Sequence, residues 1–106
     1  MTYDPQGQTA ESLRALAAYL ELWLDQGKCV VMMRHGTDVC SVYFGDPAGG
    51  EVDLTVHGTI AAAVADEILE FTQAGTNQIT VGDQTYRFFR NLTHIAEVGA
   101  VIFAPV

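Results

Sequence analysis

The stretch CVVMMRHGTDVCSVYF, residues 29–44, decides the fold because it holds two apolar runs separated by a turn signal. The first run, Cys29 to Met33, is continuously apolar and too short for a helix, so we expect a strand there. Gly36-Thr37 lies at the turn, and the second run, Val39 to Phe44, is rich in residues that favour strands. The stretch therefore predicts an antiparallel β-hairpin.

An amphipathic helix is predicted before this hairpin, over residues 9–26. Thr9 is suited to cap its start, and Gly27 is placed to end it in a left-handed conformation. The apolar residues that recur at helical spacing are Leu13, Leu16, Ala17, Leu20 and Leu24. Residues 1–8 are polar and contain Pro and Gly, so we interpret them as a flexible lead-in. No linker divides the rest, which predicts one domain over residues 9–106.

Beyond the hairpin, the same order of elements recurs. Residues 51–57 alternate polar and apolar, which is typical of a half-buried strand. A second amphipathic helix is expected from Gly58-Thr59 to Gly75. Two strands flank Gly82-Asp83, a two-residue hairpin signal, and a last apolar strand, residues 100–104, follows a looser stretch.

The fold class predicted from these elements is α+β, with the order α-β-β-β-α-β-β-β. Two amphipathic helices cannot bury their apolar stripes alone, so both should cover a sheet. We therefore expect a single two-layer domain, with a mostly antiparallel sheet and both helices on one of its faces.

The turn of the first hairpin also predicts which side chains share a face. With Gly36-Thr37 as the turn, Met33 is opposite Cys40, and that face should lie under the helices. A shift of one residue would exchange the two faces, and a loop over residues 91–99 would cover the outer one. Apolar, aromatic and arginine side chains together are typical of protein interfaces. The residues predicted to form such an interface on the outer face are Val30, Met32, Arg34, Tyr43, Arg87 and Phe89.

The chain is acidic, with five Lys+Arg, 13 Asp+Glu and a formal net charge of -8. Nucleic-acid binding depends on Lys and Arg that neutralise phosphates, so direct nucleic-acid binding is not expected. Binding to anionic membranes is disfavoured for the same reason. The acidity either keeps a small domain in solution or attracts a basic protein surface. The acidic side chains assigned to such a surface are Asp46, Glu51, Asp53, Asp66, Glu67 and Glu70.

No pattern of residues points to catalysis, to a cofactor or to a metal site. Cys29 and Cys40 are predicted on one face, too far apart for a disulfide, so we expect free thiols and a reducing, cytoplasmic location. The histidines lack the close spacing of metal ligands. Glu67 is expected to have a structural partner in Arg90. No membrane span and no secretory signal are visible in the sequence.

Three classes of function remain open. The first is a non-catalytic acidic interaction protein (an inhibitor, adaptor or chaperone) that presents a surface to a protein partner. Phage-encoded inhibitors that mimic nucleic-acid charge belong to this class. The element order is similar to that of bacterial secretion chaperones, although residues 100–106 are strand-like where those proteins have a helix.

The second class is a subunit of a homodimer or larger homo-oligomer that associates through the open sheet face. The third is a small-molecule-binding domain or an enzyme with a pocket between the sheet and the helices. The predicted inward positions are mostly apolar, which disfavours this third class.

Overall fold

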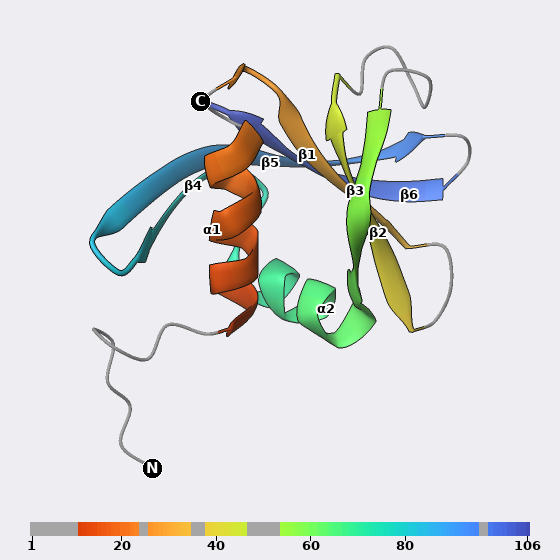
Figure 1. Ribbon diagram of the computed structural model, residues 1–106, viewed down its shortest axis with the longest axis horizontal. Coiled ribbons are helices and arrows are strands. Elements are labelled where there is room, and N and C mark those ends of the chain that lie inside the picture. The colour runs from red at the N-terminus through yellow and green to blue at the C-terminus, as the bar shows by residue number, and fades with distance from the viewer. Residues whose placement is uncertain (1–10, 24–25, 35–37, 47–53, 96–97) are drawn as a thin grey trace.

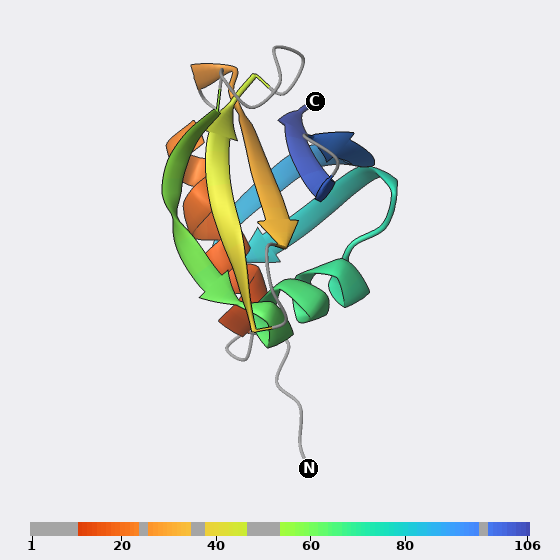
Figure 2. The same cartoon turned by 90° about the vertical axis from the view of Figure 1, so that its right-hand side faces the viewer.

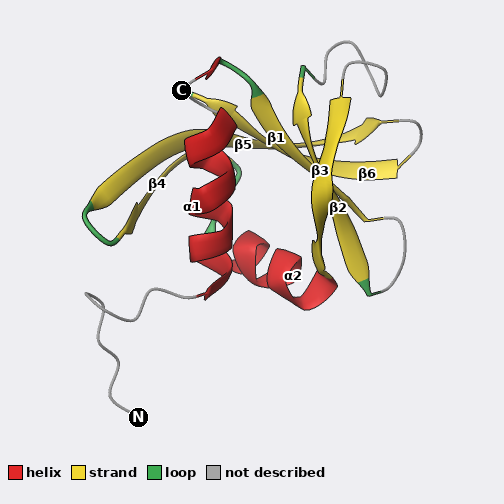
Figure 3. Ribbon diagram, in the orientation of Figure 1, coloured by secondary structure: helices red, strands yellow, loops and turns green. Residues whose placement is uncertain are grey.

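A computed structural model describes residues 11–23, 26–34, 38–46, 54–95 and 98–106, and it shows an α+β domain (Figure 1). Its elements are α1 (Glu11–Trp23), β1 (Cys29–Arg34), β2 (Val39–Gly45), β3 (Leu54–Ala61), α2 (Ala62–Phe71), β4 (Gly75–Val81), β5 (Gln84–Ile95) and β6 (Val98–Pro105). The predicted order α-β-β-β-α-β-β-β is confirmed (Figure 3). The predicted lead-in, residues 1–8, lies outside the described residues.

The six strands form one antiparallel sheet in the order β3-β2-β1-β6-β5-β4. The last strand, β6, lies between β1 and β5 and so joins the early strands to the late ones. Figure 2 shows β1, β2 and β3 side by side, with β4 and β5 crossing them at a steep angle. The sheet is therefore strongly twisted, because each strand has a right-handed twist and the rotation between neighbouring strands accumulates across six of them.

The main core lies between the two helices and one face of the sheet. Leu16 and Leu20 of α1 and Ile68 of α2 are buried there against side chains of five strands. The buried sheet residues are Val30, Met32, Val42, Ile79, Phe88 and Phe103. Because α1 and α2 share one core, both helices cover the same face, as the apolar spacing predicted.

The register of the first hairpin differs by one residue from the prediction. Arg34 is opposite Cys40 and Met32 is opposite Val42, whereas the predicted register put Met33 opposite Cys40. The shift turns the even-numbered residues of β1 toward the helices. Val30 is 0% exposed and Met32 is 4% exposed, so their predicted place on an outer face is wrong. The turn, residues 36–37, lies outside the described residues.

The reverse face of the sheet carries a second core. Val31 and Met33 of β1 are buried there, together with Ile95, Ala100 and Ile102 of the β5–β6 hairpin. Strand β1 is thus buried on both faces, like the central strands of a parallel sheet. The reverse face, which we expected to be open to a partner, is therefore buried at its centre.

The second helix is shorter than predicted at both ends. Strand β3 continues through Ala61, and the Ala62 N–H donates to the Asp38 carbonyl oxygen at 2.8 Å, so the helix begins at Ala62 rather than at Gly58-Thr59. The helix ends at Phe71, and Thr72 is already extended. Gly75, with φ of 95°, begins β4 instead of ending the helix.

The stretch predicted to be loose, residues 91–99, is mostly strand. Strand β5 continues to Ile95, and β6 begins at Val98. The long β5–β6 pairing runs from Phe88 opposite Pro105 to Ile95 opposite Val98. These residues therefore extend the sheet.

Candidate functional site

The six residues predicted as an interface lie on both faces of the sheet. Val30 and Met32 belong to the core under the helices, and Arg34 lies on the same side. The reverse side holds the other three. Tyr43 packs against the second core, Arg87 Nε donates to Gln78 Oε1 at 3.0 Å, and Phe89 is 45% exposed. The structure does not assemble these residues into one surface.

Arg34 links the sheet to α2. Its Nη2 forms an ion pair with the Asp66 carboxylate and donates to the Ala62 carbonyl oxygen at 3.5 Å. Hydrogen bonding to Cys40, followed by the charge and hydrogen bond of Asp66, raises the pKa of Arg34 above its ordinary value. The arginine predicted for a protein interface thus holds an intramolecular contact.

The acidic side chains of α2 lie on its outer side. Asp66, Glu67 and Glu70 are all exposed. Glu67 has a structural partner as expected, but that partner is Ser12, whose Oγ donates to Glu67 Oε1 at 2.7 Å. Arg90, the partner predicted for Glu67, instead donates from Nη1 to the Leu69 and Thr72 carbonyl oxygens, both at 3.0 Å.

Of the other three acidic side chains predicted for this surface, the structure describes only one. Asp46 is exposed at the end of β2, whereas Glu51 and Asp53 lie outside the described residues. Among the described residues, Glu70 makes no ion pair, while Asp66 is paired with Arg34. Glu67 and Glu70 are therefore the two carboxylates of α2 without an ion pair among the described residues.

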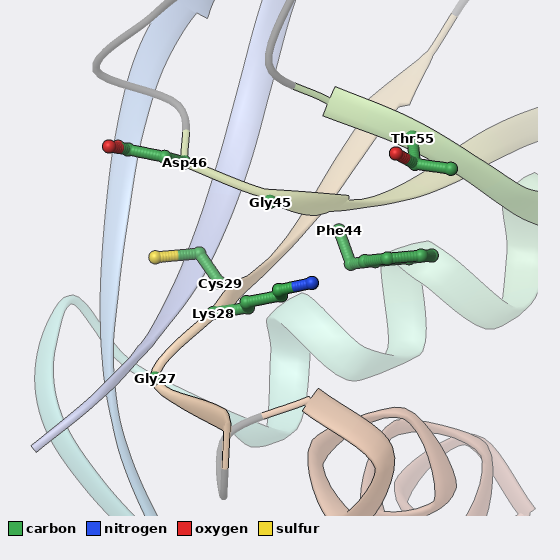
Figure 4. A pocket seen from close by; sticks show the side chains of 7 residues that line it. All are labelled: Gly27, Lys28, Cys29, Phe44, Gly45, Asp46 and Thr55. Atoms are coloured by element: carbon green, nitrogen blue, oxygen red, sulfur yellow. The ribbon is translucent and has the colours of Figure 1, made fainter.

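A first cavity, of about 550 Å³, opens where β1, β2 and β3 come together. Its lining residues are Gly27, Lys28, Cys29, Phe44, Gly45, Asp46 and Thr55. In Figure 4 the Lys28 side chain extends toward Phe44, and the Cys29 and Asp46 side chains extend the opposite way. The Lys28 ammonium lies 5.5 Å from the centroid of the Phe44 ring, which is within cation–π range.

The surroundings of the Cys29 thiol in this cavity disfavour its thiolate form. Burial, and then the negative charge of Asp46, raise its pKa above the ordinary value. A raised pKa leaves less of the reactive thiolate near neutral pH. Cys29 and Cys40 are free thiols, as predicted, but they lie on opposite faces because of the register shift.

A second cavity, of about 150 Å³, lies between α2 and the sheet, and we call it the α2 cleft. Its lining residues are Met32, Arg34, Cys40, Ala65, Asp66, Leu69, Gly99 and Val101. Leu92 is opposite Val101 in the β5–β6 pairing and is 60% exposed, so it extends the apolar surface beyond the cleft. The sequence analysis missed this cleft because its lining comes from four elements, and because Leu92 and Gly99 were assigned to a loop.

Comparison with known proteins found no matching family model, no similar curated protein and no similar solved structure. Within the described part of the chain, no helix is long and apolar enough to cross a membrane. In the same part, no three His, Cys, Asp or Glu side chains are grouped so as to hold a metal ion.

Proposed function

We propose that the protein is a non-catalytic interaction domain that binds a basic surface of another protein through the outer side of α2. The observation that carries the proposal is the charge of this helix. Asp66, Glu67 and Glu70 are exposed along it; Arg34 pairs with Asp66, whereas Glu67 and Glu70 make no ion pair among the described residues. Fields from such clustered charges steer oppositely charged partners and favour their association.

Two of the three carboxylates are held in place by the fold. Asp66 is fixed by Arg34, and Glu67 is fixed by the hydroxyl of Ser12, which is buried. A side chain that is already ordered loses less rotamer freedom when a partner binds. These contacts support a role for α2 as a preorganised acidic surface.

The class of partner follows from the charge. A basic surface that normally holds nucleic acid suits an acidic helix, because carboxylates along the helix can take the place of phosphates. Inhibitors, adaptors and chaperones all act by presenting such a surface. The two free thiols support a reducing, cytoplasmic location for this role.

The test is selection from a random dodecapeptide display library, with binding of the selected peptides measured at low and at high salt. We expect the wild-type protein to select peptides rich in Lys and Arg, whose affinity falls as salt rises. The variant Glu70→Lys should weaken this binding, whereas Glu21→Lys, the same change at an exposed site on α1, should weaken it much less. An equal loss of peptide affinity in the two variants would show that only the net charge of the protein matters, and would refute a binding site on α2.

A second candidate function is assembly with further copies of the chain through the reverse side of β2 and β3. The observation in its favour is apolar exposure at this edge of the sheet, where Val56 is 64% exposed beside half-buried Tyr43. Sedimentation velocity over a range of concentrations tests it. A mass that rises with concentration, and that Val56→Lys returns to that of a monomer, supports assembly; a constant monomer mass rules it out.

A further inference from the structure

We infer that the α2 cleft receives a large apolar side chain of the basic partner, so that the bound segment carries a leucine or an aromatic residue next to Lys or Arg. This inference rests on the proposed function and adds the residue that anchors the partner. The occupant of the cleft is thus a segment of a partner protein in which an apolar side chain adjoins a basic one.

The size and lining of the cleft fit an apolar anchor. Its volume is about 150 Å³, and Met32, Leu69 and Val101 supply apolar walls. A space of roughly 150 Å³ with apolar walls can hold a benzene ring. Interfaces typically draw most of their binding energy from a few side chains that fill such pockets.

The surface around the cleft extends this apolar contact. Leu92 stands beside Val101, a wall of the cleft, on the same sheet face and is 60% exposed. A segment that places an anchor in the cleft would also cover Leu92. Leu92 and the apolar walls of the cleft thus form adjoining apolar surface.

The charges at the rim select the residue that flanks the anchor. Asp66 lines the cleft and is neutralised by Arg34, and Glu70 follows one helical turn later on α2 without an ion pair among the described residues. A Lys or Arg beside the anchor would meet Glu70, whereas an acidic flank would be repelled. The cleft and the acidic side of α2 therefore form one continuous site for an apolar and basic segment.

Gly99 offers a direct way to fill the cleft. It lines the cavity, and a Cβ added there meets no atom within 4 Å and no unfavourable φ. Gly99→Leu should therefore occupy the cleft without straining the backbone. Gly58→Leu is the matched control, because Gly58 of β3 is equally open but does not line the cleft.

The experiment uses the basic dodecapeptides that the wild-type protein selects, labelled with a fluorophore, and measures their affinity for each variant. We expect the selected sequences to contain a leucine or aromatic residue beside Lys or Arg. Gly99→Leu should weaken binding by about tenfold, and Gly58→Leu by less than about twofold. Replacing the peptide's apolar residue with Ser should cost about tenfold against the wild-type protein and almost nothing against Gly99→Leu.

The outcomes separate this inference from the proposed function. Basic peptides without an apolar preference, still weakened by salt and by Glu70→Lys, would overturn the anchor and leave the proposed function standing. Failure to select basic peptides at all would overturn both. Binding of benzyl alcohol in the cleft, with no selected peptide, would assign it to a small molecule and also overturn the inference.

Discussion

At the scale of single residues, Cys29 shows how its surroundings set reactivity. The thiol is half-buried in the first cavity, and Asp46 adds a negative charge that disfavours the thiolate. Both effects raise the pKa of Cys29 above that of a thiol in the unfolded chain. The stability that this thiol contributes is therefore complete below the unfolded pKa and is lost as pH rises through the folded pKa.

The variant Asp46→Asn should lower the pKa of Cys29, because it removes the carboxylate charge and leaves the burial unchanged. We expect faster alkylation of Cys29 by iodoacetamide at mildly alkaline pH, with the rate profile moved to lower pH. Peptide mapping by mass spectrometry measures the rate, and Cys40, which is buried, serves as the slow internal reference. An unchanged profile would show that Asp46 does not influence the thiol.

The sequence predicted residue chemistry better than residue pairing. Free thiols and a structural partner for Glu67 were both expected, but that partner is Ser12, which lies 55 residues away in the chain. The spacing of apolar residues in α2 places Glu67 near the edge of the buried side of that helix, but it does not specify which element packs against this edge. The contact of α1 with α2 decides that, and only the folded chain shows it.

At the scale of elements, α2 ends without the glycine that commonly closes a helix. Thr72 Oγ1 donates to the Ile68 carbonyl oxygen at 2.8 Å, and Arg90 reaches across from β5 to the Leu69 and Thr72 carbonyl oxygens. These contacts satisfy carbonyl groups that a helix end leaves without intrahelical partners. The positive charge of Arg90 also suits the negative end of the helix dipole.

Replacing Arg90 with Met should lower the free energy of unfolding by about 1.5–3 kcal/mol, since it removes charged hydrogen bonds from partly buried carbonyls. Urea denaturation followed by circular dichroism measures the change. Arg87→Met on the same strand is the control, because Arg87 is exposed, and it should cost no more than about 0.5 kcal/mol. An equal loss in the free energy of unfolding for the two variants would show that Arg90 does not stabilise the C-terminal end of α2.

The two hairpins show what a sequence pattern can and cannot specify. Around Gly82-Asp83 the polar and apolar residues alternate, so Ile79 and Phe88 lie in the core while Arg87 and Phe89 lie on the reverse face, where they were predicted. Strand β1 is apolar at every position from Cys29 to Met33, so either register buries apolar side chains. The structure buries both faces of β1, and the pattern had no polar face from which to fix the register.

At the scale of the whole molecule, the domain holds two apolar cores, one on each side of the sheet. Met32 belongs to the core under the helices, and Met33 belongs to the core on the reverse face. Both side chains are buried although neighbouring residues in a strand point in opposite directions. Apolar side chains buried on both faces of the sheet thus contribute to the stability of the fold.

Met32→Ala and Met33→Ala should therefore destabilise the protein by similar amounts, about 2–5 kcal/mol each. Thermal or urea unfolding of the two variants measures both losses. A large loss for Met32→Ala with less than about 1 kcal/mol for Met33→Ala would show that the reverse face is open in solution. That result would make the centre of the reverse face a candidate interface as well.

The most direct test of where a partner binds is nuclear magnetic resonance of the labelled protein during titration with a selected basic peptide. A partner that docks on the helix side of the sheet should shift the signals of Ala65, Leu69, Leu92 and Val101, around the α2 cleft. Shifts confined to Tyr43, Val56 and Phe89, on the reverse face, would contradict the proposed site.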